Sequence, residues 1–194
     1  MAETPLFERL CLVGVGLIGS SIARAARKAK LAGRIVASDA SPEVRKRILE
    51  LGLVDGAHED PAEAARGADC VVLCTPLGTY KDIVARIAPA LRPGAILTDV
   101  GSVKSCVFAD IGALVPKGVH LVPGHPVAGT EHSGPDAGFA ELFEGRWAIL
   151  TPPAGADAGA VERLAAFWAG LGSTVEIMDA ARHDLTLADR KSVV

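Results

Sequence analysis

Three glycines near the N-terminus have the spacing of a phosphate-binding turn. Residues 14–19 read Gly-Val-Gly-Leu-Ile-Gly and directly follow an apolar run of strand length. In such a turn Gly14 permits the tight bend, Gly16 lets the backbone approach a pyrophosphate, and Gly19 lets the next helix pack closely on the strand. That helix begins with backbone N–H groups and the positive end of its dipole. The pattern favours dinucleotide binding over an ordinary glycine-rich turn, because a strand precedes it and a helix follows.

A carboxylate follows the second apolar run, at the position where dinucleotide-binding folds have a residue that binds the adenosine ribose. Asp39 ends the next apolar run, 20 residues after Gly19, and there it can accept hydrogen bonds from the ribose hydroxyls and repel a 2′-phosphate. NAD is therefore favoured over NADP. The alternative for Asp39 is a solvated turn residue or the cap of the helix after Pro42. NADP stays open because hydroxyl and basic side chains lie nearby: Ser38, Ser41, Arg45 and Arg47.

Polar residues follow three later apolar runs, and ligands in open α/β sheets lie beyond the carboxyl ends of the strands. Thr75-Pro76, Gly101-Ser102 and His125 stand at these ends. An imidazole exchanges protons near neutral pH, and Ser102 could orient the ring or share a substrate proton. Two structural alternatives remain open: Ser102 only caps a helix, and His125 only satisfies a buried carbonyl. Asp99 and Lys104, on the same tail as Ser102, are left without an assigned role.

The elements that must position these residues alternate along the chain. Apolar runs of strand length cover residues 9–13, 34–38, 70–74, 95–98, 119–122, 147–150 and 174–178, and helical stripes cover 18–29, 83–91 and 161–171. Their lack of polar alternation is typical of strands buried on both faces. The order predicts an α/β fold, a doubly wound Rossmann-type mainly parallel sheet, with residues 1 to about 180 forming one domain.

Composition excludes several other classes of protein. The longest uncharged stretch has 14 residues, 10–23, against the roughly 20 that a membrane helix needs. With 194 residues, a net charge of −3 and a sequence pI near 5.9, the chain has no basic field for nucleic acid. Acidic residues precede the first basic residue, unlike a signal peptide, which predicts a cytoplasmic protein. The four cysteines lack metal-ligand spacing, so we expect reduced thiols and no metal site.

Four segments taken together resemble the prephenate/arogenate dehydrogenase family, the cyclohexadienyl dehydrogenases. They are residues 14–21, 98–104 and 124–134 and the dipeptide His183-Asp184. The resemblance runs in order from about Leu10 to Ala188. Many dehydrogenases share the glycine motif, whereas the second and third segments in combination are specific to this family.

The resemblance implies an oxidation in tyrosine biosynthesis. Prephenate would give 4-hydroxyphenylpyruvate, or arogenate would give tyrosine, as a hydride leaves for the nicotinamide, the ring carboxylate departs as carbon dioxide, and the ring aromatises. His125 matches the catalytic histidine that accepts the hydroxyl proton, and Ser102 matches the serine that bonds both this hydroxyl and the imidazole. Thr130 and Glu131 match residues that line the substrate pocket.

The expected site therefore has two parts. The substrate-binding residues are Ser102, His125, Thr130 and Glu131. The cofactor-binding residues are Gly14, Gly16, Leu17, Ile18, Gly19, Asp39, Thr75, Pro76 and Gly101.

The chain departs from the family pattern near its end. In the family, a helix beginning near the position of His183 leads into an all-helical domain that forms a homodimer and supplies an arginine for a substrate carboxylate. Residues 181–188 are expected to begin this helix. Residues 189–194 read like a translated sequencing adapter, which we interpret as an artefact that truncated the gene; the alternative is a variable C-terminus. The chain as given is then expected to bind NAD but to turn over poorly.

Two other classes of function remain to be discriminated. Another Rossmann dehydrogenase, of the β-hydroxyacid type or a pyrroline carboxylate reductase, would share the glycine motif but lack the His125 tail. A dinucleotide-sensing module without catalysis would bind NAD(H) and tolerate the loss of Ser102 and His125.

Overall fold

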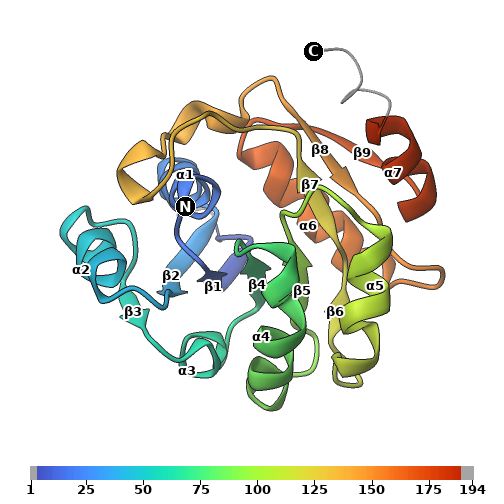
Figure 1. The fold of residues 1–194 in the computed structure, drawn as a ribbon, viewed down its shortest axis with the longest axis horizontal. Helices are drawn as coiled ribbons and strands as arrows, with labels where there is room; N and C mark the ends of the chain where they lie inside the picture. Colours follow the sequence, from blue (N-terminus) through green and yellow to red (C-terminus); the bar gives the residue numbers. More distant parts are fainter. Residues whose placement is uncertain (1–3, 189–194) are drawn as a thin grey trace.

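The computed structural model describes residues 4–188, and a parallel six-stranded sheet forms the centre of this part of the chain (Figure 1). The strand order is β3-β2-β1-β4-β5-β6, and all five neighbouring pairs are parallel. The strands are β1 (Phe7–Val13), β2 (Ala32–Ser38), β3 (Gly56–His58), β4 (Cys70–Leu73), β5 (Ile96–Asp99) and β6 (His120–Leu121).

Helices cover both faces of this sheet. The α-helices are α1 (Leu17–Lys28), α2 (Pro42–Glu50), α3 (Pro61–Ala65), α4 (Tyr80–Ile87), α5 (Ser105–Ile111), α6 (Ala158–Gly170) and α7 (Ala180–Ala188). Short 3-10 turns are η1 (Leu77–Thr79), η2 (Ala88–Ala90), η3 (Gly112–Leu114), η4 (Pro135–Ala137) and η5 (Ala140–Phe143). The expected doubly wound architecture is confirmed.

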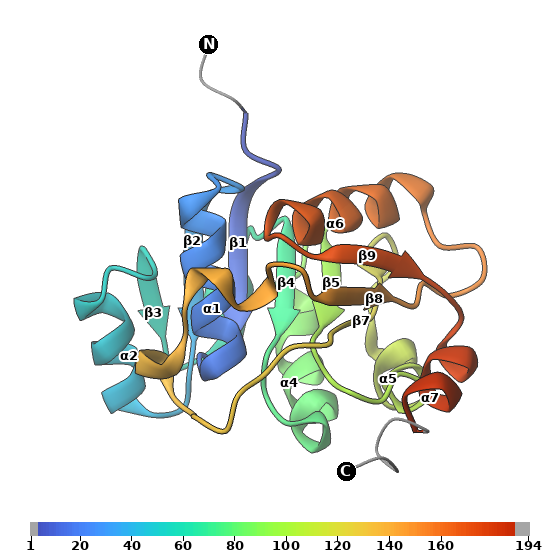
Figure 2. The same ribbon diagram turned by 90° about the horizontal axis from the view of Figure 1, so that it is seen from above.

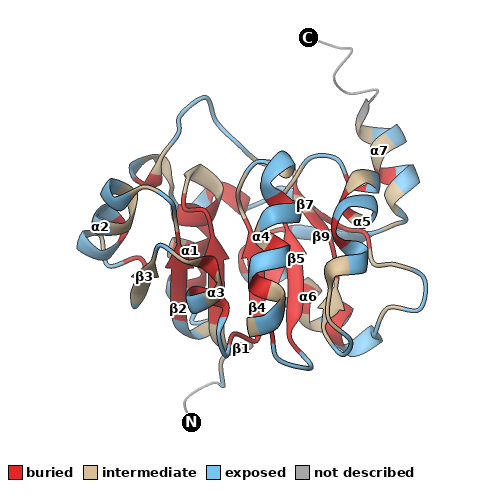
Figure 3. Cartoon of the chain, turned by 60° about the horizontal axis from the view of Figure 1, so that its bottom comes forward, coloured by how far each residue is buried: buried red, intermediate tan, exposed pale blue. Residues whose placement is uncertain are grey.

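The uninterrupted apolar runs are explained by two hydrophobic clusters, one on each face. Leu10 and Leu12 of β1 enter the cluster shared with α1, α2 and α6, whereas Cys11 and Val13 enter the cluster shared with α3, α4 and α5. Side chains of a strand alternate between faces, so a strand covered on both sides needs apolar residues at every position. Figure 3 shows these central strands as the most buried part of the fold.

Three more strands form a separate sheet, which the sequence did not predict. They are β7 (Gly124–Pro126), β8 (Trp147–Leu150) and β9 (Thr174–Ile177), with β7 antiparallel and β9 parallel to β8. The runs at 147–150 and 174–178 were expected to join the central sheet. Pro123 separates β6 from β7, and a proline has no N–H to continue a ladder. Instead, its carbonyl accepts from Thr151 N at 2.9 Å, which leads the chain into the second sheet.

Two strands were missed for local reasons. β3 has only Gly56, Ala57 and His58, with no β-branched residue to mark a strand. β7 consists of Gly124, His125 and Pro126, which are typical loop residues. Because β7 carries His125, this histidine lies on a strand rather than on the expected loop.

The chain reverses its direction across the sheet next to β1. It moves outward from β1 through β2 to β3 and then returns to β4 on the other side of β1. The loops after β1 and β4 diverge at such a point and leave a crevice. The loop after β5 and the start of β7 lie beside it, because Gly124 N donates to Asp99 Oδ1 at 3.2 Å.

The last described helix, α7, lies against α5 (Figure 2). It begins at Ala180, one residue before the expected start at 181. The expectation for residues 189–194 falls outside the described residues. None of the helices within residues 4–188 is both long and apolar enough to cross a bilayer.

Candidate functional site

In the glycine turn after β1, two glycines are needed for the fold and one faces open space. Gly14 has a φ of +87°, and a Cβ there would lie 2.7 Å from Thr75 Cγ2. A Cβ on Gly19 would lie 2.4 Å from the carbonyl oxygen of Gly14. A Cβ on Gly16 would meet nothing within 4 Å. Gly14 and Gly19 are therefore needed for the turn and for helix packing, while Gly16 faces open space that a pyrophosphate could enter.

A cleft of about 520 Å³ opens beside this turn, at the carboxyl ends of β1, β2 and β4. It brings together five of the expected cofactor-binding residues: Gly14, Gly16, Asp39, Thr75 and Pro76. The remaining four lie elsewhere. Leu17 and Ile18 pack, partly buried, against the core from the first turn of α1, and Gly19 is buried beneath the turn. Gly101 lies beyond β5, where its N–H donates to Asp99 Oδ2 at 2.8 Å.

Asp39 joins the end of β2 to the glycine turn. Its Oδ2 accepts from Val15 N at 2.9 Å, and its Oδ1 accepts from Ser41 N at 3.0 Å. The cap of α2 is Ser41, whose Oγ accepts from Val44 N at 3.1 Å. Asp39 is thus half-buried in the cleft wall and is not the helix cap that was the alternative.

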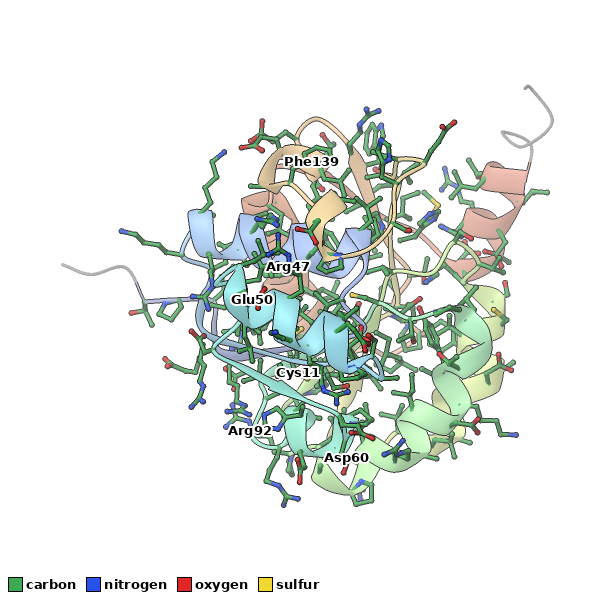
Figure 4. All side chains as sticks on the ribbon, turned by 60° about the vertical axis from the view of Figure 1, so that its left-hand side comes forward. Cys11, Arg47, Glu50, Asp60, Arg92 and Phe139 are labelled. Carbon is green, nitrogen blue, oxygen red and sulfur yellow. The ribbon has the colours of Figure 1, made fainter. Side chains whose placement is uncertain are left out.

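The basic side chains close to Asp39 are committed to protein partners. Arg45 donates to the carbonyls of Asp39 at 2.8 Å and Ala40 at 2.9 Å, and it also pairs with Glu59 at 3.3 Å. Arg47 binds Asp136 beyond β7, with a Nε–Oδ1 distance of 2.9 Å; Figure 4 labels Arg47 on α2. Because both guanidinium groups already bind oxygen atoms of the protein, they are less available to bind a 2′-phosphate.

His125 is joined to the last helix by a chain of hydrogen bonds. Its Nδ1 lies 2.9 Å from Nε2 of His183, and Nδ1 of His183 lies 2.8 Å from Oδ1 of Asp184. His183 is fully buried, and His125 is half-buried. The alternative that His125 only satisfies a loop carbonyl does not account for this contact.

The Asp184 carboxylate determines on which ring nitrogens of His183 and His125 the protons lie. Partial burial opposes its ionisation, but hydrogen bonds from Ser105, the backbone of Lys104 and His183 hold its pKa well below the usual value. An ionised Asp184 accepts from His183 Nδ1–H. With His183 neutral, its Nε2 is an acceptor, Nδ1 of His125 donates to it, and the lone pair of a neutral His125 lies on Nε2.

A buried ion pair connects the segment after β5 to the start of β7, the strand that carries His125. Asp99 and Lys104 are 1% and 0% exposed, and the Lys104 ammonium contacts Asp99 Oδ2. Lys104 Nζ also donates to the carbonyl of Gly124 at 2.7 Å, and Tyr80 Oη donates to Asp99 Oδ2 at 3.2 Å. Burial raises the pKa of Asp99 and lowers that of Lys104, and each partner's charge opposes the shift of the other. Asp99 and Lys104, at and after the end of β5, are therefore both hydrogen-bonded to Gly124, the residue before His125.

The other expected substrate residues are solvent-exposed. Ser102 lies in the loop between β5 and α5, and because α5 begins only at Ser105, Ser102 is not its N-cap. Thr130 and Glu131 follow β7, and Thr130 Oγ1 accepts from His132 N at 3.3 Å. Thr130 and Glu131 lie five and six residues after His125, and Ser102 lies two residues before Lys104, which binds the carbonyl of Gly124.

Sequence reasoning missed the roles of four residues that the structure places around His125: His183, Asp184, Asp99 and Lys104. His183-Asp184 was noticed as a motif but was given no role. A His-Asp dipeptide at a helix start, and an Asp-x4-Lys pair at a strand end, were the available signals. In residues 4–188, no group of three or more His, Cys, Asp or Glu side chains is arranged to hold a metal ion.

Comparison with known proteins identifies similar chains. Residues 22–177 match the family model described as prephenate dehydrogenase, nucleotide-binding domain. A cyclohexadienyl dehydrogenase from Zymomonas mobilis is 41% identical over 183 residues, which is 94% of this chain and 62% of that protein.

Two solved structures share the fold and retain moderate sequence identity. One is a prephenate dehydrogenase from Aquifex aeolicus in complex with hydroxyphenyl propionate and NAD+, with a TM-score of 0.86 and 30% identity. The other is an arogenate dehydrogenase from Synechocystis, with a TM-score of 0.86 and 29% identity. This chain is covered to 96% and 93%, but it spans only 64% and 63% of theirs.

Proposed function

Because this chain belongs to the prephenate dehydrogenase family, we propose that it supplies the cofactor site and the catalytic base for NAD-dependent oxidative decarboxylation. The substrate is prephenate, which becomes 4-hydroxyphenylpyruvate, or arogenate, which becomes tyrosine. The observation that carries this proposal is the position of His125. Its neighbour Gly124 is bonded through its backbone to Asp99 and Lys104 at the end of β5, and its own Nδ1 lies 2.9 Å from Nε2 of His183.

The residues of the cleft fit a dinucleotide. The open space at Gly16 and the N-terminus of α1, which lacks a side-chain cap, suit a pyrophosphate. Asp39 stands where an adenosine ribose would lie, and its charge favours NAD over NADP. Bound NAD would supply the acceptor for the hydride.

The protein's part in the chemistry is to hold the substrate hydroxyl and remove its proton. The basic Nε2 of His125 accepts this proton as the ring carbon becomes a carbonyl carbon. Ser102, on the neighbouring tail, is proposed to bond the same hydroxyl and orient it, and Thr130 and Glu131 are proposed to line the substrate pocket. Loss of carbon dioxide and aromatisation make the reaction effectively irreversible.

Assembly and location are part of the same proposal. We propose that the complete protein acts as a homodimer in the cytoplasm, as the family resemblance implies. The chain spans 62% of the Zymomonas mobilis relative, so residues that complete the substrate pocket are proposed to lie outside these 194 residues.

A binding and single-turnover experiment tests the proposal. NAD and NADP would be titrated calorimetrically into the 194-residue chain, and excess protein would then be mixed with NAD and either prephenate or arogenate while NADH absorbance is followed. We expect binding of NAD, weaker binding of NADP, and NADH formation that His125→Asn abolishes without changing NAD affinity. Failure to bind NAD, or equal NADH formation by His125→Asn, would contradict the proposal.

A further inference from the structure

The histidine that serves as base does not stand alone in the structure. His125, His183 and Asp184 form one hydrogen-bonded series, with heavy-atom distances of 2.9 and 2.8 Å. His183 is completely buried, and the Asp184 side chain is 24% exposed. A buried imidazole between a base and a carboxylate is an arrangement that can share a proton.

Asp184 is itself held in place by the loop that carries Ser102. Its Oδ1 accepts from Lys104 N at 2.8 Å, and its Oδ2 accepts from Ser105 N at 2.9 Å. These two N–H groups stand at the start of α5, where they have no partner within the helix. The same carboxylate therefore orients His183 and ties α7 to the tail that follows β5.

We propose that His183 and Asp184 are positioning residues that fix the tautomer of His125 and share the proton that it takes from the substrate. This inference deepens the proposed function and rests on it. In the step, the substrate O–H bond breaks and an N–H bond forms at Nε2 of His125. The proton on Nδ1 of His125 then moves to Nε2 of His183, whose positive charge lies next to the Asp184 carboxylate. The proton passes to water after the product has left.

The surrounding charges are compatible with this movement. Lys104, at the N-cap of α5, and Asp99 of β5 are both buried, and they form an ion pair with each other. Cys106 of α5 also faces this region, and burial raises the pKa of its thiol, so that it stays neutral. Asp184 is thus the anion that can stabilise a cationic imidazole pair.

Nitrogen NMR of the histidine rings tests the tautomer directly and does not depend on turnover. In the 194-residue chain labelled with 15N-histidine, we expect His125 and His183 both to carry their proton on Nδ1 when neutral. His183→Gln should preserve the His125 tautomer, because the amide oxygen of Gln still accepts from Nδ1–H. His183→Leu should release it toward a mixture of the two tautomers. Observation of the Nε2–H tautomer of His125 in the unmodified chain would overturn the proposal.

Replacement of the carboxylate tests the charge-sharing part. Asp184→Asn should shift the tautomer populations of His183 and His125 away from Nδ1–H, since the anion that accepts from Nδ1–H of His183 is gone. Asp110→Asn is the matched control, because it removes the same charge from an exposed position on α5. Circular dichroism of each variant establishes that it has folded. An equal shift in both variants, or no shift in either, would contradict a specific role for Asp184.

Kinetics separate this inference from the function on which it rests. We expect His183→Gln and His183→Leu to lower kcat about 10- to 100-fold, because assistance to proton transfer is lost. The KM should change less than about twofold, and the pH profile of kcat should shift. If NADH forms but kcat and its pH profile are unchanged in both variants, the relay is refuted and the function stands. If the tautomers are as expected but no cyclohexadienyl substrate is oxidised, the proposed function is refuted instead.

Discussion

The ammonium of Lys104 donates a hydrogen bond to the carbonyl oxygen of Gly124 at 2.7 Å, one residue before His125. The bond joins segments of two different sheets, since Lys104 lies in the segment that follows β5 of the central sheet and Gly124 begins β7 of the second sheet. A lysine in this position is commonly solvated, but here it is completely buried and paired with Asp99. The bond fixes the start of β7, which carries His125, relative to the loop that carries Ser102.

Replacing Lys104 is expected to destabilise the fold. Lys104→Met leaves Asp99 buried without its cation, and breaking a buried pair in this way costs about 3–5 kcal/mol. Urea unfolding followed by circular dichroism measures the change. The double variant Lys104→Met with Asp99→Asn should recover part of the loss, since no uncompensated charge remains; a double variant less stable than Lys104→Met would contradict the explanation.

Two glycines of the same turn are expected to respond in opposite ways. Gly19→Ala places a Cβ 2.4 Å from the Gly14 carbonyl oxygen, and such overpacking costs about 1–3 kcal/mol. Gly16→Ala meets no atom within 4 Å, so its stability should stay within about 0.5 kcal/mol, while NAD affinity falls because the methyl group blocks the pyrophosphate. Thermal unfolding and calorimetric NAD titration of both variants test this contrast, which equal behaviour of the two would disprove.

Cofactor preference is expected to depend on Asp39. Asp39→Asn keeps an oxygen to accept from Val15 N but removes the charge that faces the ribose. The Kd for NAD should rise about tenfold or more, as loss of a charged hydrogen bond worth about 1.5 kcal/mol would give, and the Kd for NADP should fall. Parallel titrations with both dinucleotides measure the ratio. Glu59→Gln, at another acidic position in the cleft wall, is the control for a general loss of negative charge; an identical change in the ratio would remove Asp39 from specificity.

Acid stability is expected to reveal the carboxylate of Asp184. Its pKa is lowered in the folded state, so the unfolded chain binds its proton first as the pH falls. The stabilisation is complete above the unfolded pKa of about 3.9 and is lost as the pH falls toward the lower folded value. The difference in unfolding free energy between the unmodified chain and Asp184→Asn should therefore shrink below about pH 4. Urea titrations at several pH values test this, and a difference that grows on acidification would be inconsistent with it.

Local sequence patterns determined the cofactor half of the site. The glycine turn, Asp39 and the strands that precede them lie within one β-turn-α-β segment, where spacing along the chain sets the distances in space. Runs such as residues 10–13 predicted burial on both faces, because each successive side chain had to be apolar. These features depend on residues that are close along the chain, so their spacing alone is enough to predict them.

Only the tertiary structure decided how His125 and its partners are brought together. His183 lies 58 residues from His125, and Asp184 lies 80 residues from Lys104. No periodicity encodes such contacts, because they depend on where Pro123 turns the chain into a second sheet and on how α7 then packs against α5. The sequence by itself determined which residue types could do the chemistry. The burial of Lys104 and the partner of His125 were decided by packing between distant elements, since burial makes unpaired polar groups costly and so selects their partners.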